Sequence, residues 1–265
     1  MSSIVYPPDY HTHTELCHHA SGMPVDYAEF AELKGLEEIA CTDHAPAPWK
    51  YDPEHRMVSP QFVRYRDGVL KAQATGKCRV LYGIEADYYD GCEPYLARWL
   101  PEQSFDLVLG SVHTGDFWKF DARREYPDPF IKNLWRVYFT QLQKLVRTGL
   151  YDVIAHFDLP KRSGIGITDA ILREIVIPTL DAVAQAGMGI EINTSGLHHP
   201  AGETYPSPQI LSWACERSIP ITFGSDAHSP DRVGNDFETA MQLAREAGYT
   251  HSARYRQRQR TLEPF

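Results

Sequence analysis

A short apolar strand followed by an amphipathic helix recurs seven times in this chain, and this alternation constrains its fold more than any other feature. The predicted strands cover residues 4–10, 38–42, 79–85, 106–112, 152–155, 189–193 and 220–224. The predicted helices cover residues 25–34, 60–75, 94–100, 129–148, 169–186, 208–217 and 236–247. Such alternation is typical of a parallel sheet. Seven units in 265 residues predict one α/β domain over residues 1–265, built as a closed or nearly closed barrel.

A doubly wound open sheet is the rival architecture, because it shares the same alternation. Its nucleotide-binding versions carry a glycine-rich loop after a strand, and this chain has neither G-x-G-x-x-G nor G-x-x-x-x-G-K-[ST]. The last predicted helix has one apolar face, formed by Phe237, Ala240, Met241 and Ala244. That spacing is the one expected of a helix that covers a barrel.

Composition and charge exclude several classes of function. A net charge of −9 disfavours a nucleic-acid partner. No apolar run reaches the ~18–20 residues that span a bilayer, and the N-terminus lacks a signal peptide, so we expect a cytoplasmic protein without a membrane partner. Five cysteines without a C-x-x-C pair are expected to be reduced. The basic run at residues 254–260 is expected to be a solvated surface.

Ionisable side chains gather just past the predicted strand ends. Six strand ends carry them: His11-Thr12-His13, Asp43-His44, Glu85, His113, His156 and Asp226-Ala227-His228. In a parallel barrel these ends lie on one face, where active sites are built. So many groups would repel one another or lose solvation unless a cation joined them. Neutral imidazole with carboxylate suits zinc, manganese or iron, so the sequence predicts a metal centre.

The spacing of two of these motifs supports the same interpretation. Residues i and i+2 of a strand point to the same side, so His11 and His13 can bind one ion. Asp226 and His228 repeat this spacing after the last predicted strand. The two motifs are neighbours if the barrel closes.

These motifs, in this order, resemble the polymerase-and-histidinol-phosphatase (PHP) superfamily. The resemblance covers almost the whole chain and includes His18-His19-Ala20 and Gly110-Ser111-Val112-His113. The chain looks like the histidinol-phosphatase branch in four segments: Thr42-Asp43-His44-Ala45-Pro46, Gly83-Ile84-Glu85-Ala86-Asp87-Tyr88, Glu191-Ile192-Asn193-Thr194 and Tyr205-Pro206-Ser207-Pro208. The family fold is a distorted (β/α)7 TIM-like barrel, in agreement with the number of units counted above.

The resemblance implies three divalent metal ions per chain, for which Zn, Fe and Mn are all suitable. The first ion would be bound by His11, His13, Glu85 and Asp226. Glu85 would bridge to a second ion, bound also by His113 and His156. The third would be bound by His19, His44 and His228, with His19 preferred to His18 because the family's ligand precedes a small residue such as Ala20. Catalytic roles are assigned to Glu85, Asp226 and His228.

The implied activity is a metal-dependent phosphatase, most specifically the hydrolysis of L-histidinol phosphate to L-histidinol and inorganic phosphate in histidine biosynthesis. A water that bridges two ions is acidic enough to supply hydroxide at neutral pH. One position departs from the branch, which has a basic residue, usually arginine, after the Gly-Leu that follows Asn193-Thr194. Here that residue is His198. Another small phosphate monoester is therefore the alternative substrate.

Loop cations are expected to hold the small phosphorylated substrate. The candidates are Lys161, Arg162, Arg56, Arg232 and His198, with His55 and His199 as weaker ones. Five loop aromatics would either cover the pocket or pack onto the barrel rim: Trp49, Tyr51, Phe117, Trp118 and Tyr205. The sequence carries no prediction of oligomeric state.

Two other classes of function use similar motifs. An amidohydrolase also has H-x-H on its first strand, but it usually needs a carbamylated lysine, and no predicted strand ends in lysine. The superfamily also supplies non-catalytic domains of DNA polymerases. That alternative is disfavoured because every expected ligand position is filled here.

Overall fold

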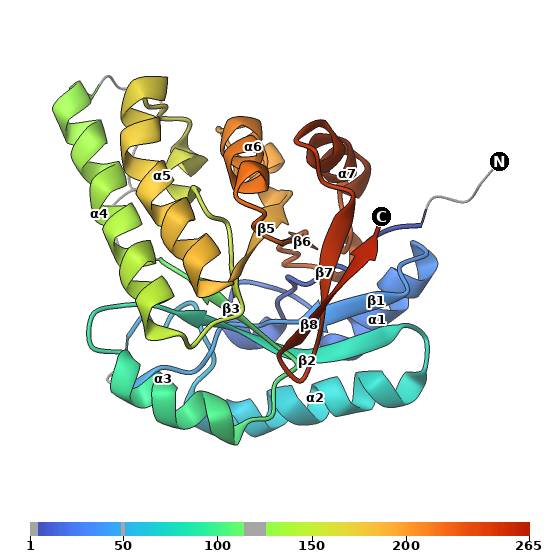
Figure 1. The fold of residues 1–265 in the computed structure, drawn as a ribbon. Coiled ribbons are helices and arrows are strands. Elements are labelled where there is room, and N and C mark those ends of the chain that lie inside the picture. The colour runs from blue at the N-terminus through green and yellow to red at the C-terminus, as the bar shows by residue number, and fades with distance from the viewer. Residues whose placement is uncertain (1–4, 49–50, 114–125) are drawn as a thin grey trace.

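The computed structural model describes residues 5–48, 51–113 and 126–265. Its main sheet has six parallel strands that pair in chain order and curl around a common axis (Figure 1). The strands are β1 (Glu38–Cys41), β2 (Arg79–Asp87), β3 (Leu107–Ser111), β4 (Val153–Ile154), β5 (Gly189–Asn193) and β6 (Ile221–Gly224). Each parallel pairing forces the chain to cross back before the next strand begins, and a helix makes each crossing.

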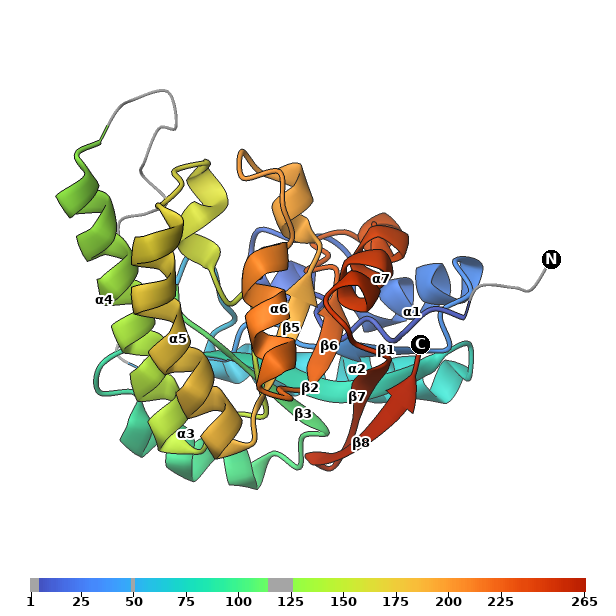
Figure 2. The ribbon, with the colours of Figure 1, turned by 45° about the horizontal axis from the view of Figure 1, so that its top comes forward.

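In the described ranges of the chain, seven α-helices cover the outside of this sheet (Figure 2). They are α1 (Pro24–Leu33), α2 (Phe62–Thr75), α3 (Glu93–Trp99), α4 (Asp128–Thr148), α5 (Asp169–Ala186), α6 (Pro208–Glu216) and α7 (Phe237–Glu246). The predicted apolar face of α7 is buried: Phe237, Ala240, Met241 and Ala244. Within the described part of the chain, no helix is both long and apolar enough to cross a membrane. The predicted α/β fold, a distorted TIM-like barrel, is confirmed.

The first predicted strand, residues 4–10, is wrong in its bounds. The extended segment that enters the barrel is instead residues 9–13, which we call the closing segment. Asp9 bridges to Ile39 of β1 and to Phe223 of β6, so the closing segment joins the two edges of the sheet. Pro7 and Pro8 have no backbone N–H to donate, which prevents a regular ladder before Asp9.

A C-terminal hairpin, β7 (His251–Arg256) and β8 (Gln259–Pro264), closes the barrel at the N-terminal ends of its strands. Tyr255 inserts among the inward-facing side chains: Tyr10, Ala40, Leu81, Leu107, Leu109, Val153 and Ala155. Arg258 donates to the carboxylate of Asp152 at 3.0 Å. Arg256 pairs with Glu38. The basic run at residues 254–260 is therefore not simply a solvated surface, because Arg256 and Arg258 pair with acids at or just before the starts of β1 and β4.

Replacing Tyr255 by alanine is expected to lower the free energy of unfolding by about 3–5 kcal/mol, the usual cost of removing a large aromatic ring from a core. The ring is 2% exposed, so its removal leaves a cavity inside the barrel. Urea denaturation measures the change. Leu262→Ala in the same hairpin is the control, because Leu262 is 56% exposed and should change stability by less than about 0.5 kcal/mol. Equal losses in both variants would contradict a buried role for Tyr255.

Candidate metal centre

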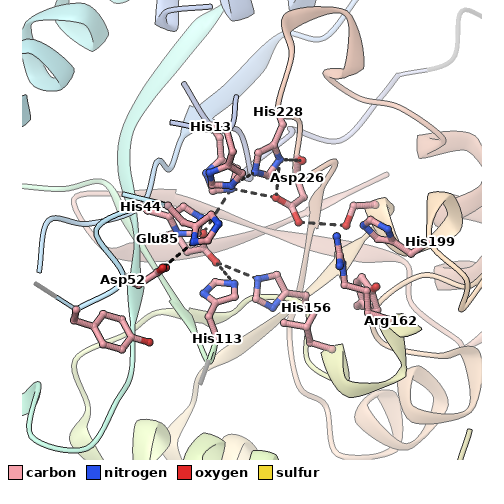
Figure 3. Close-up of a pocket in the computed structure, with 16 residues that line it drawn as sticks. His13, His44, Asp52, Glu85, His113, His156, Arg162, His199, Asp226 and His228 are labelled. Carbon is pink, nitrogen blue, oxygen red and sulfur yellow. Dashed lines mark hydrogen bonds and ion pairs between the residues drawn. The ribbon is translucent and has the colours of Figure 1, made fainter. Parts of the chain in front are cut away.

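Nine ionisable side chains meet at the C-terminal ends of the strands. Figure 3 shows those that line the adjoining pocket, among them His44, Glu85 and Asp226. They come from the closing segment, the loop after the 3₁₀ turn Glu15–Cys17, β2, and the loops after β1, β3, β4 and β6. They are His11, His13, His19, His44, Glu85, His113, His156, Asp226 and His228. The structure thus brings together every residue that the sequence pattern predicts as a ligand. The exposed His18 is not among the residues that line this site.

Glu85 lies at the centre of the cluster and is fully buried. One carboxylate oxygen, Oε1, lies 3.0 Å from Nε2 of His156 and 3.7 Å from Nε2 of His113. The other, Oε2, lies 2.9 Å from Nδ1 of His44 and 3.4 Å from Nε2 of His11. Oε2 is also 3.6 Å from Nε2 of His13. One carboxylate therefore faces five imidazoles on both of its oxygens, as a bridging ligand must.

Asp226 is the second carboxylate of the cluster. Its Oδ1 lies 3.1 Å from Nε2 of His13 and 3.6 Å from Nε2 of His11. The backbone of Asp226 is left-handed, with φ 54°, a conformation that costs energy in a residue other than glycine. This turn directs the side chain back over the barrel axis, toward the histidines of the closing segment.

Three histidines form the outer part of the cluster: His19, His44 and His228. Nδ1 of His19 lies 2.8 Å from the carbonyl oxygen of Cys17, and Nδ1 of His228 lies 2.8 Å from that of Asp226. Both Nδ1 atoms must carry a hydrogen to donate to these oxygens, so each neutral ring has its lone pair on Nε2. The two Nε2 atoms are only 2.9 Å apart. Two lone pairs at this distance repel unless a cation joins them.

Both carboxylates and two of the imidazoles of the cluster have ionisation states that suit metal binding at neutral pH. Burial raises the pKa of Glu85, but the surrounding imidazoles outweigh it, and its pKa lies well below the ordinary value. The pKa of Asp226 is low for the same reason. Burial lowers the pKa of His44 to about 4 and that of His228 to about 3. The carboxylates are therefore anionic and these imidazoles neutral, which are the forms that bind metals.

Several buried polar atoms of the cluster make no hydrogen bond, among them Nε2 of His11, Nδ1 of His44 and Oε2 of Glu85. Leaving such atoms buried without a partner is costly. All three point into the cluster, where a cation would satisfy them together. A donor set of imidazole nitrogens and carboxylate oxygens is the one preferred by zinc and neighbouring transition metals. The residues present therefore fit divalent metal ions.

In the structure, the groups of possible metal-binding atoms that lie within 4.8 Å of one another match the predicted ligand sets only in part. His19, His44 and His228 form one group whose nitrogens lie within 4.8 Å of one another, and His11, His13 and Glu85 form another. The second predicted set is not a separate group. Its members divide between His44–Glu85–His113 and His11–His156–Asp226, each also within 4.8 Å.

A cavity of about 810 Å³ opens onto the cluster. Besides six of the histidines and both carboxylates of the cluster, it is lined by Tyr51, Asp52, His55, Leu159, Arg162, Ser195, His199 and Tyr205. Arg162 therefore lies where the sequence places a substrate cation, and His55 and His199, the weaker candidates, also line the wall. Asp52 and Ser195 were not predicted. Asp52 lies near the predicted cation Arg56, which is the one signal that could have found it.

Two of the predicted substrate cations bind protein groups instead of lining the cavity. Lys161 is buried, and its ammonium lies 2.9 Å from Asp158 and 3.0 Å from Glu203. Arg56 is 3% exposed and donates to Asp87 at 2.8 Å. Both side chains are turned into the protein because buried carboxylates compete with solvent and substrate for them.

The other two predicted cations also lie outside the cavity wall. His198 is about half exposed and pairs with Asp236 at 2.7 Å. Arg232 ends an exposed 3₁₀ turn, Pro230–Arg232, and does not contribute to the lining. Proximity in sequence to the Asp226 motif was therefore not enough to place Arg232 at the site.

The aromatic candidates divide between described and undescribed residues. Tyr51 and Tyr205 line the cavity. Tyr51 also stacks on Tyr89 with ring centroids 3.8 Å apart, so it packs on the rim as well as facing the pocket. Trp49, Phe117 and Trp118 lie outside the described residues.

Comparison with known proteins places these features in a family. Residues 9–195 match the PHP domain, and residues 208–237 match a family described as PHP-associated. A protein of Deinococcus radiodurans named probable histidinol-phosphatase is 38% identical over 245 residues, covering 91% of this chain and 93% of that protein. The histidinol-phosphatase of Bacillus subtilis is 28% identical, covering 88% of this chain and 98% of that protein.

A solved structure has a similar fold. It is the histidinol phosphate phosphatase of Lactococcus lactis, described as a complex with Zn, L-histidinol and phosphate. The TM-score is 0.81 at 22% identity, and the match covers 97% of this chain and 100% of the other.

Proposed function

The chain belongs to the PHP domain family, and from this premise we propose that it hydrolyses L-histidinol phosphate to L-histidinol and inorganic phosphate at a centre of divalent metal ions. The observation that carries the proposal is the cluster of nine ligand-type side chains beneath a cavity of about 810 Å³. The names of the Deinococcus radiodurans and Bacillus subtilis relatives support the substrate. A cytoplasmic location and the absence of nucleic-acid and membrane partners stay predictions.

We propose three ions per chain, with zinc, iron or manganese as the metal. His11, His13, Glu85 and Asp226 would hold the first, and Glu85 together with His113 and His156 would hold the second. His19, His44 and His228 would hold the third. The unbonded buried atoms at the centre of the cluster need one cation, and the facing Nε2 atoms of His19 and His228 need another. These two places support more than one ion, and the count of three rests on the family resemblance.

The chemistry divides between the ions and the chain. Bound divalent ions neutralise phosphoryl oxygens and acidify a water molecule, which is the chemistry that phosphate monoester hydrolysis needs. Glu85 and Asp226 hold the positive charge at the floor of the cavity. Arg162 and His199 lie together on one side of the cluster, and Asp52 lies on the other (Figure 3). The attacking water releases a proton, and Asp226 or His228 would relay it to the leaving alkoxide.

A comparison of substrates tests the proposed function. L-histidinol phosphate is expected to be turned over with a kcat/KM in the ~10⁴–10⁸ M⁻¹s⁻¹ range of enzymes on good substrates. Sugar, nucleotide and other amino-alcohol phosphates should react far more slowly. A preference for another phosphate of that panel would favour a different small phosphate monoester as the substrate. This is the leading alternative because His198 stands where the resembled branch has a basic residue. Comparable rates on all of them would point to a general phosphatase.

Arg162→Ala is expected to raise KM for L-histidinol phosphate by ~10–100-fold, since a hydrogen bond to a charged group contributes about 1.5–3 kcal/mol. Metal content should stay unchanged, because Arg162 is not a proposed ligand. Steady-state kinetics with metal analysis separates the two effects. Arg232→Ala is the matched control, because that arginine is exposed and does not line the cavity. The same KM in wild type and Arg162→Ala would remove Arg162 from the substrate site.

A further inference from the structure

Glu191 is a buried acid that the proposed metal chemistry does not use. It lies in the middle of β5, and its side chain is 1% exposed. Among the residues that the structure describes, none of the close groups of possible metal-binding atoms includes it. A buried carboxylate is costly unless hydrogen bonds or charges compensate it, so its contacts indicate its purpose.

Both oxygens of Glu191 are occupied by donors that belong to the metal centre or lie next to it. Oε1 lies 2.7 Å from Nδ1 of His11. Oε2 accepts from the backbone N–H of His156 at 2.9 Å and from the side-chain amide of Asn193 at 3.0 Å. Two of these contacts reach proposed ligands, His11 and His156, at atoms other than the nitrogen proposed to bind metal. The third reaches Asn193, which lies next to the cluster.

The contact with His11 selects the tautomer of that ring. A carboxylate can only accept, so Nδ1 of His11 must carry the hydrogen, and the lone pair is on Nε2. That Nε2 lies 3.4 Å from Glu85 and 3.6 Å from Asp226, in the proposed first metal site. Carboxylates that hold a ligand histidine in this way fix the ring orientation and increase its basicity.

The contact with His156 acts on the backbone. His156 has φ 28°, an unfavourable conformation for a residue with a side chain. Its N–H is held by Oε2 of Glu191, so the same carboxylate anchors the strained residue that presents Nε2 to Glu85 at 3.0 Å.

Gly224, at the end of β6, makes room for the pair of Glu191 and His11. A Cβ atom at position 224 would lie 1.9 Å from Oε1 of Glu191 and 2.7 Å from Cβ of His11. Any side chain there would push the two apart. The neighbouring strand therefore accommodates this contact with a residue that has no side chain.

We propose that Glu191 is a positioning residue that sets the tautomer of His11 and the backbone of His156, and so prepares two ligands on opposite sides of Glu85 for metal. The inference rests on the proposed metal centre but not on the identity of the substrate. It requires a carboxylate specifically, because all three partners of Glu191 are donors. An amide at position 191 would turn its own N–H groups toward one of them.

Glu191→Gln tests this requirement, because it changes the charge and the hydrogen-bonding pattern but hardly the size. We expect the affinity for Zn²⁺, measured by competition with a chromophoric chelator, to fall by ~10–100-fold, the usual cost of losing a ligand's outer partner. In ¹⁵N NMR of the zinc-loaded protein, the Nδ1–H resonance of His11 should lose its carboxylate hydrogen bond. An unchanged zinc affinity in a folded Glu191→Gln protein would overturn the proposal.

Glu38→Gln is the matched control, since Glu38 is also a buried strand glutamate, but it pairs with Arg256 at the opposite end of the barrel. Its zinc affinity should equal that of wild type, and a comparable loss would overturn the proposal by marking a general effect of buried charge. If Glu191→Gln fails to fold, a Glu191→Asp variant takes its place and should show weaker zinc binding. Weakened zinc binding without any turnover of histidinol phosphate in wild type would support the positioning role while refuting the proposed function.

Discussion

Glu85→Ala is expected to eliminate nearly all phosphatase activity and to lower the metal content. Mutating a residue that only holds a metal ligand in place costs up to ~100-fold in activity. The loss in kcat/KM for Glu85→Ala should be larger, because Glu85 is itself the proposed bridging ligand. Its two oxygens face five imidazoles, so no neighbour can replace it without a rearrangement of the cluster. Elemental analysis and steady-state kinetics on the same preparation measure both effects.

Three further variants make the Glu85 result interpretable. Glu85→Gln keeps the size of the side chain but removes its charge, and it should lose activity almost as completely. Glu246→Ala removes an exposed glutamate at the end of α7 and should leave both readouts unchanged. Asp226→Ala should behave like Glu85→Ala, because it removes the other anionic ligand. Near-normal turnover in Glu85→Ala or Asp226→Ala would contradict the proposed ligand sets.

Removal of the metal ions by a chelator is expected to reduce turnover to the level of the uncatalysed reaction. Adding Zn²⁺, Mn²⁺ or Fe²⁺ back should restore it, with one metal restoring it best. The melting temperature should rise on re-addition, because an ion that binds only the folded state at 100 times its Kd adds about 2.7 kcal/mol of stability. The ions would also relieve the repulsion and the unsatisfied buried atoms of the empty cluster.

Elemental analysis of protein prepared without chelator is the complementary measurement. More than one equivalent of transition metal per chain is expected, and up to three. A preparation that is both metal-free and fully active would refute the metal-dependent mechanism. Tyr255→Ala provides a control for the melting experiment, because it lowers stability from the opposite end of the barrel without touching a proposed ligand.

The barrel and the cluster could be predicted because both follow from local patterns. The periodicity that distinguishes a strand from a helix can be read within a short segment of sequence. In a parallel barrel the C-terminal ends of the strands lie on one face, independent of the conformation of the loops. A histidine just past a strand end, such as His113 or His156, is therefore positioned by the fold itself. The same reasoning explains why His11 and Asp226 meet although they lie at opposite ends of the chain.

The substrate cations were harder to predict, because the direction of a long side chain depends on partners distant in sequence. Arg56 is drawn inward by Asp87, and Lys161 by Asp158 and Glu203. Nothing near either cation in sequence separates them from Arg162, which lines the cavity. The C-terminal hairpin was missed for a similar reason. Its arginines were interpreted as a solvated charge run. The acids that pair with Arg256 and Arg258, Glu38 and Asp152, lie far away in the sequence.

The closing segment has a consequence for how the protein is made. The carboxylate of Asp9 accepts from the backbone N–H of Ser225, which lies 216 residues later. During synthesis the segment with His11 and His13 leaves the ribosome long before its partner β6. At ~5–20 residues per second it waits on the order of ten seconds or more with one edge unpaired. Until then the proposed first metal site also lacks Asp226. A metal ion can therefore complete this proposed site only after nearly the whole polypeptide has emerged.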